Sequence, residues 1–187
     1  NDSFDTLDLW TSKFGRYLKK YWLKHKFIGA PGVTFIHLSD IFFPSIQRIT
    51  ANKKRYAISD SHLTMGFIGL YKFYSNDNYY KKALCLVNHL IDNSVRTKYG
   101  IGWGQPFIWV TPSGEVPANN PMITTTAYCY DAIKALEAIK NKSSYNLILK
   151  EITNFVYRDL KGDRISNNKE DAIYGYNYRG SWVRTVD

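Results

Sequence analysis

Two segments of this 187-residue chain match one another after a shift of 65 residues, and this internal repeat constrains the fold most strongly. In each copy, a stretch with apolar residues at helical spacing is followed by a turn and a second such stretch. The turns, "SNDN" at 75–78 and "KNKSS" at 140–144, coincide without a gap. The sequence therefore predicts two helical hairpins, near 58–94 and 122–160. The alternative is two unrelated amphipathic hairpins, which any all-α protein can contain.

A long segment whose one charged residue is a glutamate follows the first predicted hairpin. It reads "GIGWGQPFIWVTPSGEVPANNP" from Gly100 to Pro121 and contains no lysine or arginine. Once about eight extra residues are allowed after the second helix, the repeat pairs its "GWGQPFIW" with "GYNYRGSW" at 175–182. Because one hairpin cannot bury both of its faces, neighbouring hairpins must stack on it, and the long loops then emerge on the same side. We therefore expect an all-α fold of stacked helical hairpins forming a partial (α/α) toroid, with long aromatic loops on one face.

Glycines and apolar residues add detail to this expectation. Gly66 and Gly69 lie on one face of the helix predicted over 58–75 and are expected to permit close approach of another helix. The N-terminal part, residues 5–50, is also predicted to be helical, with apolar residues at helical spacing through 7–22. "GAPG" at 29–32 is predicted to break the chain, and a short helix or irregular segment is predicted around Pro44. No apolar run is long enough for a transmembrane helix.

The formal charge of +9 suggests an acidic partner, such as nucleic acid, an anionic membrane surface or an anionic glycan. Nucleic acid is not expected, because the main basic cluster at 13–26 is far in sequence from the aromatic loops and no RNA-binding motif is present. The same 7–26 helix has aromatic and leucine residues opposite its lysines, which fits peripheral membrane contact. Core packing explains that apolar stripe equally well.

Two cysteines, Cys85 and Cys129, form neither a disulfide framework nor a zinc pattern. Both are expected to be buried, reduced thiols inside helices. Reduced thiols favour a cytoplasmic location, with the inner face of the membrane as an extension of that prediction. No metal and no cofactor are predicted.

Several of these motifs together resemble the (α/α) toroid proteins. The similarity lies in "SDSHLTMGFIGLYKF", "NYYKKALCLVNHLI", "GIGWGQPFIW" and "NNPMITTTAYCYDAIKALE", and covers about residues 36–182. An "SD.H" helix start, a "GWG.PF.W" loop and a Pro–Thr helix start carry it. The family includes six-hairpin glycosidase-like enzymes and toroids related to terpenoid cyclases. More narrowly, the chain resembles toroid proteins encoded with bacterial cell-surface polysaccharide biosynthesis.

The resemblance implies carbohydrate handling, often of acidic or modified sugars, and does not fix one reaction. The Asp-rich motif of terpene cyclases is absent, and Cys85, Cys129 and His62 lack the zinc-ligand pattern of toroidal lanthionine cyclases. The chain holds about half of the helices that a closed six-hairpin toroid needs. We therefore expect one incomplete domain over 1–187, completed by the rest of its chain or by another subunit.

Cleavage of a glycan by hydrolysis or elimination needs an acid together with a carboxylate, histidine or tyrosine as base or nucleophile. Asp60 is the best acidic candidate, with His62 two residues further on and Glu115 in the long loop. Each has an ordinary alternative: Asp60 as a helix cap, His62 as a packing residue and Glu115 as a solvated side chain. The repeat pairs Asp60 with Thr125, which supports the cap.

Aromatic and amide side chains in the two long loops form the candidate substrate-binding set, because flat rings stack on the C–H face of a sugar. These residues are Trp103, Gln105, Phe107, Trp109, Tyr176, Tyr178, Arg179 and Trp182. The alternative is that the rings fill the centre of the toroid and hold the loops together. The two roles can be shared among the rings.

The resemblance, together with the aromatic loops, implies a carbohydrate-active protein of bacterial surface-polysaccharide metabolism. If it is an enzyme, a glycan hydrolase, polysaccharide lyase or epimerase is expected, with a poly- or oligosaccharide as partner, including anionic ones. The alternative is a non-catalytic glycan-binding or scaffold module in polysaccharide assembly. A toroid acting on an isoprenoid-linked substrate is the third hypothesis, which the missing Asp-rich motif disfavours.

Overall fold

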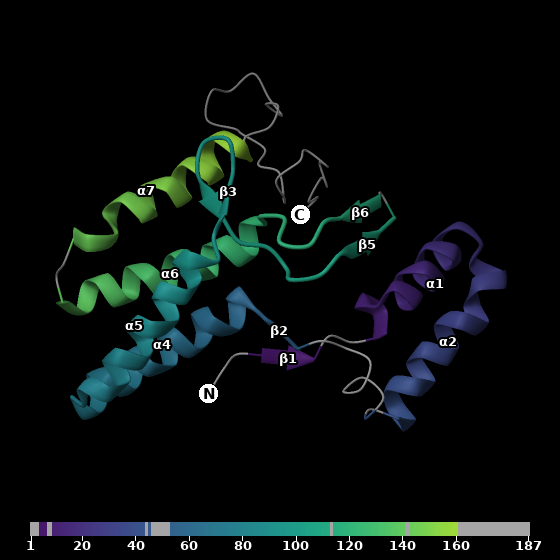
Figure 1. Ribbon diagram of the computed structural model, residues 1–187, viewed down its shortest axis with the longest axis horizontal. Helices are drawn as coiled ribbons and strands as arrows, with labels where there is room; N and C mark the ends of the chain where they lie inside the picture. The colour runs from purple at the N-terminus through teal and green to yellow at the C-terminus, as the bar shows by residue number, and fades with distance from the viewer. Residues whose placement is uncertain are drawn as a thin grey trace, which may run out of the picture. The chain divides into compact units, whose positions relative to one another are not determined.

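The computed structural model describes residues 4–6, 9–43, 45, 53–112, 114–140 and 143–160. This part of the chain is mostly helical (Figure 1), which confirms the all-α class predicted from the sequence. It also contains three short two-stranded ladders that the helical periodicity did not predict. The chain divides into two compact units, one built from the residues before Ala57 together with Pro106–Ala118, and the other from the remaining residues.

The first unit contains a helical hairpin and two antiparallel strand pairs. Its elements are β1 (Phe4–Thr6), η1 (Leu9–Thr11), α1 (Lys13–Lys24), α2 (Lys26–Phe42), β2 (Lys53–Arg55), β5 (Trp109–Thr111) and β6 (Gly114–Val116). Strand β1 pairs with β2, and β5 pairs with β6. Ser12 caps α1 at its start, where its hydroxyl oxygen accepts a hydrogen bond of 2.9 Å from the Gly15 amide.

The prediction that "GAPG" at 29–32 breaks the chain is wrong, because these residues lie inside α2. The chain turns instead at His25, whose backbone is not helical. Gly29 and Gly32 serve helix packing: a Cβ on Gly29 would lie 2.4 Å from the Trp22 Cα atom, and one on Gly32 would lie 2.9 Å from a Leu18 methyl carbon. The glycines therefore let α2 approach α1 more closely than any larger residue would allow.

Replacing Gly29 by Ala is expected to destabilise the protein by about 1–3 kcal/mol, because the new methyl group would overlap the backbone of α1. The measurement is urea unfolding followed by circular dichroism. Gly66→Ala is the matched control, since a Cβ at Gly66 meets no atom within 4 Å. That change is expected to raise stability by about 0.5–1 kcal/mol through helix propensity. An unchanged stability of Gly29→Ala would contradict the close packing of α1 and α2.

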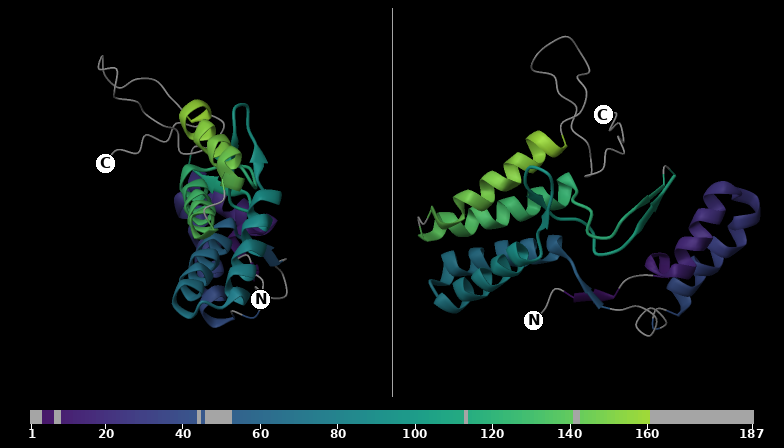
Figure 2. Two further views of the ribbon diagram at one scale, coloured as in Figure 1. Left: turned by 90° about the vertical axis from the view of Figure 1, so that its left-hand side faces the viewer. Right: turned by 45° about the horizontal axis from the view of Figure 1, so that its top comes forward.

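The second unit contains two further helical hairpins, which lie side by side in both views of Figure 2. Its elements are α4 (Ala57–Tyr74), α5 (Asp77–Asp92), β3 (Val95–Arg96), β4 (Ile101–Gly102), α6 (Ile123–Lys140), η2 (Ser143–Tyr145), α7 (Asn146–Asn154) and the π-helical turn η3 (Phe155–Asp159). Helix α4 packs against both α5 and α6, and α6 packs against α7. Strand β3 pairs antiparallel with β4.

The core of the second unit recurs along the chain at the predicted offset. Buried residues 65 positions apart, one in each hairpin, form six pairs: Asp60 and Thr125, Ser61 and Thr126, Thr64 and Cys129, Ile68 and Ile133, Val87 and Ile152, and Leu90 and Phe155. The first helices of the two hairpins, α4 and α6, have 18 residues each. The sequence register thus matches the burial of these side chains.

Gly66 and Gly69 do not meet another helix within the part of the chain that the structure describes. A Cβ on either residue would have no atom within 4 Å. The same helix exposes large apolar side chains, among them Leu63, Leu70 and Phe73, the last at 80% of its surface. One face of α4 is therefore open and apolar.

The second half of the long segment forms a β-hairpin where a loop was expected. Strands β5 and β6 pair Trp109 with Val116, Val110 with Glu115 and Thr111 with Gly114. The β-branched residues of "WVT" and "EV" favour strands, and Pro112 lies in a turn directly after β5. Gly114 has a φ of +135°, a backbone conformation that other residues rarely adopt.

Candidate functional site

The aromatic segment that contains most of the predicted binding residues is divided between the two units. Trp103 and Gln105 belong to the second unit, whereas Phe107, Trp109 and Glu115 belong to the first. The sequence predicted that these side chains lie together on one loop surface. Tyr176, Tyr178, Arg179 and Trp182 lie outside the described residues.

Trp103 is a core residue with 2% of its surface exposed. Its indole N–H donates a hydrogen bond of 2.7 Å to the carbonyl oxygen of Leu90. That carbonyl is among the last four of α5, which have no partner within their own helix. The Trp103 amide donates to the Thr126 hydroxyl at 3.1 Å, and its carbonyl accepts from the Met122 amide at 2.9 Å. Of the two roles considered for Trp103, core packing is the one observed.

The glycines beside Trp103 explain how the loop enters the core. A Cβ on Gly100 would lie 2.0 Å from the Glu151 carbonyl oxygen, and one on Gly104 would lie 2.0 Å from that of Asn120. The chain can follow this path only where no side chain is present. Gln105 is half-buried, and its carbonyl oxygen accepts a 2.6 Å hydrogen bond from the Asn119 amide. The "GIGWG" stretch is thus a structural joint between α5, α6 and α7.

Trp103→Phe is expected to lower the stability of the protein by about 1–3 kcal/mol, because it leaves the Leu90 carbonyl buried without its donor. Urea unfolding monitored by circular dichroism measures the change. Trp109→Phe provides the control, since 38% of the Trp109 surface is exposed and the substitution is expected to change stability by less than about 0.5 kcal/mol. Equal losses of stability from Trp103→Phe and Trp109→Phe would contradict the role of Trp103 as a buried joint between the helices.

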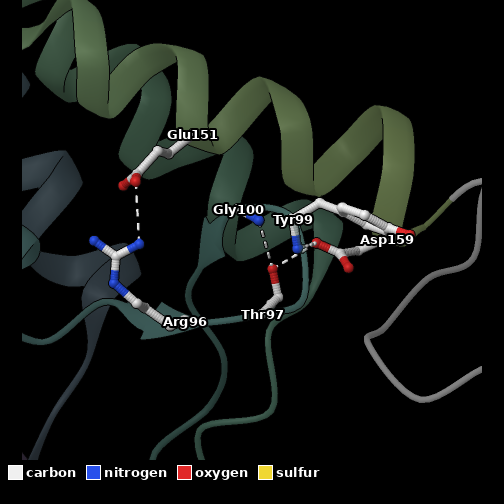
Figure 3. A network of polar contacts seen from close by, with 6 residues as sticks. All are labelled: Arg96, Thr97, Tyr99, Gly100, Glu151 and Asp159. Carbon is white, nitrogen blue, oxygen red and sulfur yellow. Dashed lines mark hydrogen bonds and ion pairs between the residues drawn. The ribbon is translucent and has the colours of Figure 1, made fainter.

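A network of polar contacts fastens the start of the loop to the second hairpin. Figure 3 shows Arg96 paired with Glu151, and Thr97 and Tyr99 turned toward Asp159. The Arg96–Glu151 ion pair has a length of 3.0 Å. The Thr97 hydroxyl donates to the Asp159 carboxylate at 2.5 Å, and the Tyr99 amide donates to it at 3.2 Å. Sequence reasoning missed this network, because its partners lie about 55–62 residues apart and follow no local pattern.

Asp60 is buried, with 3% of its surface exposed, in the first turn of α4. The helix begins at Ala57, so Asp60 lies inside the helix rather than at the capping position that its sequence context suggested. A carboxylate in the first turn is favourable because the N-terminal end of a helix carries partial positive charge. The Asp60 charge also acts on Cys129 across the seam between α4 and α6.

Cys129 is fully buried at this seam, and burial raises the pKa of its thiol to about 12. The Asp60 charge adds to the rise, whereas the Ser61 hydroxyl, 3.5 Å from the sulfur, opposes it. The thiol therefore stays protonated at neutral pH and is a poor nucleophile. The expectation that Cys85 is buried is wrong: it is exposed, on the side of α5 that also carries exposed Lys81 and Lys82.

Thr125, the repeat partner of Asp60, has a buried hydroxyl that lacks a hydrogen-bond partner among the described residues. Only 1% of Thr125 is exposed. Such groups are uncommon in folded proteins because burial without a partner costs free energy.

His62 and Tyr128 meet on the surface of the same seam. Their ring centroids are 4.9 Å apart, with an interplanar angle of 42°. Both residues are exposed, and 46% of the Tyr128 surface is accessible. His62 therefore packs against one aromatic ring, that of Tyr128, as its packing role predicts. The pair also presents two groups able to exchange protons with a bound molecule.

Glu115 lies on β6 and forms an ion pair of 2.8 Å with Lys20 of α1. The pair borders a cleft of about 460 Å³ between α1 and the β5–β6 hairpin. The cleft is lined by Lys20, Leu23, Lys24, Val110, Thr111, Pro112, Gly114 and Glu115. Two lysines and one glutamate give it a formal charge of +1. Sequence reasoning identified Glu115 and missed Lys20, which comes from a helix about 95 residues away and has no local signal.

Phe107 and Trp109 lie on the same hairpin segment but do not line this cleft. Phe107 packs against the Tyr56 ring, with centroids 6.2 Å apart. Trp109 is exposed and does not line the cleft, although its strand neighbours Val110 and Thr111 do. The rings of the predicted binding set that the structure describes therefore do not line this cleft.

The described residues contain no cluster of three or more metal-ligating side chains. Within the second unit, Asp60 and His62 occupy different environments, the first buried and the second exposed. No described helix is long and apolar enough to cross a bilayer. The two units therefore carry separate candidate sites: the lysine-lined cleft of the first unit and the His62–Tyr128 pair of the second.

Comparisons with protein-family models, with curated proteins and with solved structures give no match to this chain.

Proposed function

We propose that this chain is a carbohydrate-active protein of surface-polysaccharide metabolism, and that its cleft between α1 and β5–β6 binds an acidic sugar. The observation that carries the proposal is the pairing of Lys20 and Glu115 at the edge of a cleft that also contains Lys24. Binding is favoured over catalysis as the role of this cleft, because Glu115 is the one carboxylate among its lining residues. Glycan hydrolysis requires two such groups.

The cleft has the two chemical features that an acidic sugar needs. The Lys24 ammonium group can pair with the sugar carboxylate, and Lys20 can exchange its partner Glu115 for the same group. Leu23 and Val110 supply apolar surface for the C–H face of the ring. A neutral sugar would gain only the apolar contact with Leu23 and Val110. The cleft therefore favours uronic acids and other acidic sugars over neutral ones.

The toroid remains a proposal for the arrangement of the hairpins. Two observations from the second unit support it. One face of α4 is open around Gly66 and Gly69. At the other hairpin, a largely apolar groove of about 390 Å³ lies between α6 and α7, lined in part by Tyr130, Ile152 and Tyr157. Further hairpins stacked at both places would cover these surfaces, as in an (α/α) toroid completed by more of this chain or by another subunit.

The test is titration with oligogalacturonate, an acidic probe, with neutral dextran oligosaccharide for comparison, followed by isothermal calorimetry. Lys24→Gln is expected to weaken oligogalacturonate binding about fivefold, or about 1 kcal/mol. Glu115→Gln is expected to tighten binding severalfold, because Lys20 then loses its competing partner. Lys150→Gln is the matched control, since it removes the same charge from α7 in the other unit.

Two results would contradict the cleft as the binding site. One is equal affinity for oligogalacturonate and dextran. The other is weaker binding after Glu115→Gln, which would give Glu115 a direct role with the ligand in place of the competing role described above.

A second candidate function is β-elimination on the same class of acidic sugar, and the His62–Tyr128 pair favours it. Neutral His62 would remove the proton at C5 while the C4–O bond breaks, leaving a C4–C5 double bond. The Tyr128 hydroxyl would donate a proton to the leaving oxygen. The pair therefore supplies a proton acceptor and a proton donor beside one another for the two proton transfers of the reaction.

The elimination candidate predicts that oligogalacturonate incubated with the protein gains the ultraviolet absorbance of an unsaturated uronate. His62→Gln is expected to reduce that rate about a hundredfold or more, as loss of a general base does. His89→Gln is the control, because His89 is also exposed but lies on α5 beside Asn93. Absence of any absorbance change with the unmodified protein would exclude this candidate for the probe and leave binding as the function.

A further inference from the structure

The outer side of α2 is an apolar surface with few charges. Helix α2 turns Gly29, Ile36 and Ser39 inward, and these residues are buried. Its other side exposes six large apolar residues: Phe27, Ile28, Phe35, Leu38, Ile41 and Phe42. Phe27 has 97% of its surface exposed. After Lys26, the one charged residue of this helix is Asp40, which is half-buried. A surface of this kind on a folded protein indicates a site of interaction.

The neighbouring helix α1 is strongly basic. It carries five lysine or arginine residues, at positions 13, 16, 19, 20 and 24, and no aspartate or glutamate. Lys26 adds a sixth positive charge at the start of α2, directly before Phe27. Helix α1 also exposes an aromatic stripe of Phe14, Tyr17 and Tyr21, in which the two tyrosine rings are stacked with centroids 6.4 Å apart. Positive charge and exposed apolar rings therefore occur together in one hairpin.

We propose that the α1–α2 hairpin binds the surface of an anionic lipid bilayer, with α2 lying in the interface and Lys13, Lys19 and Lys26 contacting the headgroups. The lysines match a negative surface, and the phenylalanine, isoleucine and leucine side chains match the acyl boundary beneath it. Tyrosine rings favour the depth of the headgroups. Because no described helix can span a bilayer, the hairpin would lie on the membrane.

A second copy of this chain is a poorer occupant for the same surface. Two such hairpins in contact would bring twelve positive charges together, six from each, and neither hairpin supplies more than the carboxylate of Asp40 in return. An anionic bilayer satisfies both the charge and the apolar surface. This membrane proposal is independent of the acidic-sugar cleft, since Lys20 and Lys24, which line that cleft, are not needed for it.

The test is co-sedimentation of the full chain with vesicles of phosphatidylcholine alone and with vesicles of equal parts phosphatidylcholine and phosphatidylglycerol. Binding is expected to the second kind and to weaken as salt is raised. The combined change Lys13→Gln, Lys19→Gln and Lys26→Gln is expected to weaken binding about a hundredfold, since each lysine near an anionic surface contributes about fivefold. Phe27→Ser is expected to weaken binding about tenfold through lost apolar contact.

Matched controls come from the second unit. Lys72→Gln, Lys81→Gln and Lys150→Gln together remove the same charge from exposed positions on α4, α5 and α7. Phe73→Ser removes an aromatic ring of similar exposure, 80%, from α4. Both controls are expected to retain binding within about twofold of the unmodified protein. All substituted positions except Lys19 are exposed, and circular dichroism checks that each variant is folded.

Three outcomes would overturn the proposal. Binding to neither kind of vesicle, or equally to both, would exclude an anionic lipid surface. If the triple lysine control on α4, α5 and α7 lost as much binding as the combined change at Lys13, Lys19 and Lys26, the effect would come from net charge alone. Self-association that Phe27→Ser abolishes, in the absence of vesicle binding, would assign the α2 surface to a second copy of the chain.

Discussion

The arrangement of the second unit depends on the hydrogen bond from the Trp103 indole to the Leu90 carbonyl. The carbonyls in the last turn of a helix need a partner from outside the helix, and one that is buried cannot obtain it from water. Trp103 supplies the donor and also fills the space between the helices with a large apolar ring. Its backbone then contacts Thr126 and Met122 at the start of α6. One residue thus connects the end of the first hairpin to the beginning of the second.

This joint changes the role of the aromatic segment. The absence of lysine and arginine over 100–121 suits a chain that must enter a core at Trp103 and then leave it again. Beyond Gln105 the segment joins the other unit, where it forms a two-stranded ribbon. There Glu115 meets Lys20, so the basic helix and the acidic ribbon neutralise part of each other's charge. The proposed acidic-sugar cleft and the proposed membrane surface use different lysines of that helix.

The sequence predicted the helices of the second unit well because their stability comes from a periodic apolar face, which is visible in one dimension. The predicted hairpins near 58–94 and 122–160 compare with 57–92 and 123–159 in the structure. The prediction from sequence failed at Gly29 and Gly32, because packing of α1 on α2 overrides the local tendency of "GAPG" to form a turn. The β5–β6 ribbon had a local signal in "WVTPSGEV" that a helix-based interpretation overlooked.

The candidate site was less predictable than the fold, since its partners are distant in sequence. Glu115 was identified from its loop position, but its pairing with Lys20 depends on tertiary structure. The burial of Trp103 and the exposure of Trp109 cannot be distinguished by composition, because the two residues lie six positions apart in the same aromatic run. Asp60 and His62 are two residues apart on one helix, so they point in different directions. Burial, and not residue type, separates structural from surface roles in this chain.

The most direct test of this division is ¹⁹F NMR of the protein labelled with 5-fluorotryptophan, with resonances assigned by single substitutions. The Trp103 signal is expected to show no solvent-isotope shift between H₂O and D₂O, because the ring is buried, whereas the Trp109 signal is expected to show one. A solvent-isotope shift at Trp103 as large as that at Trp109 would mean that the Trp103 ring is exposed. It would thereby contradict the buried joint between α5, α6 and α7.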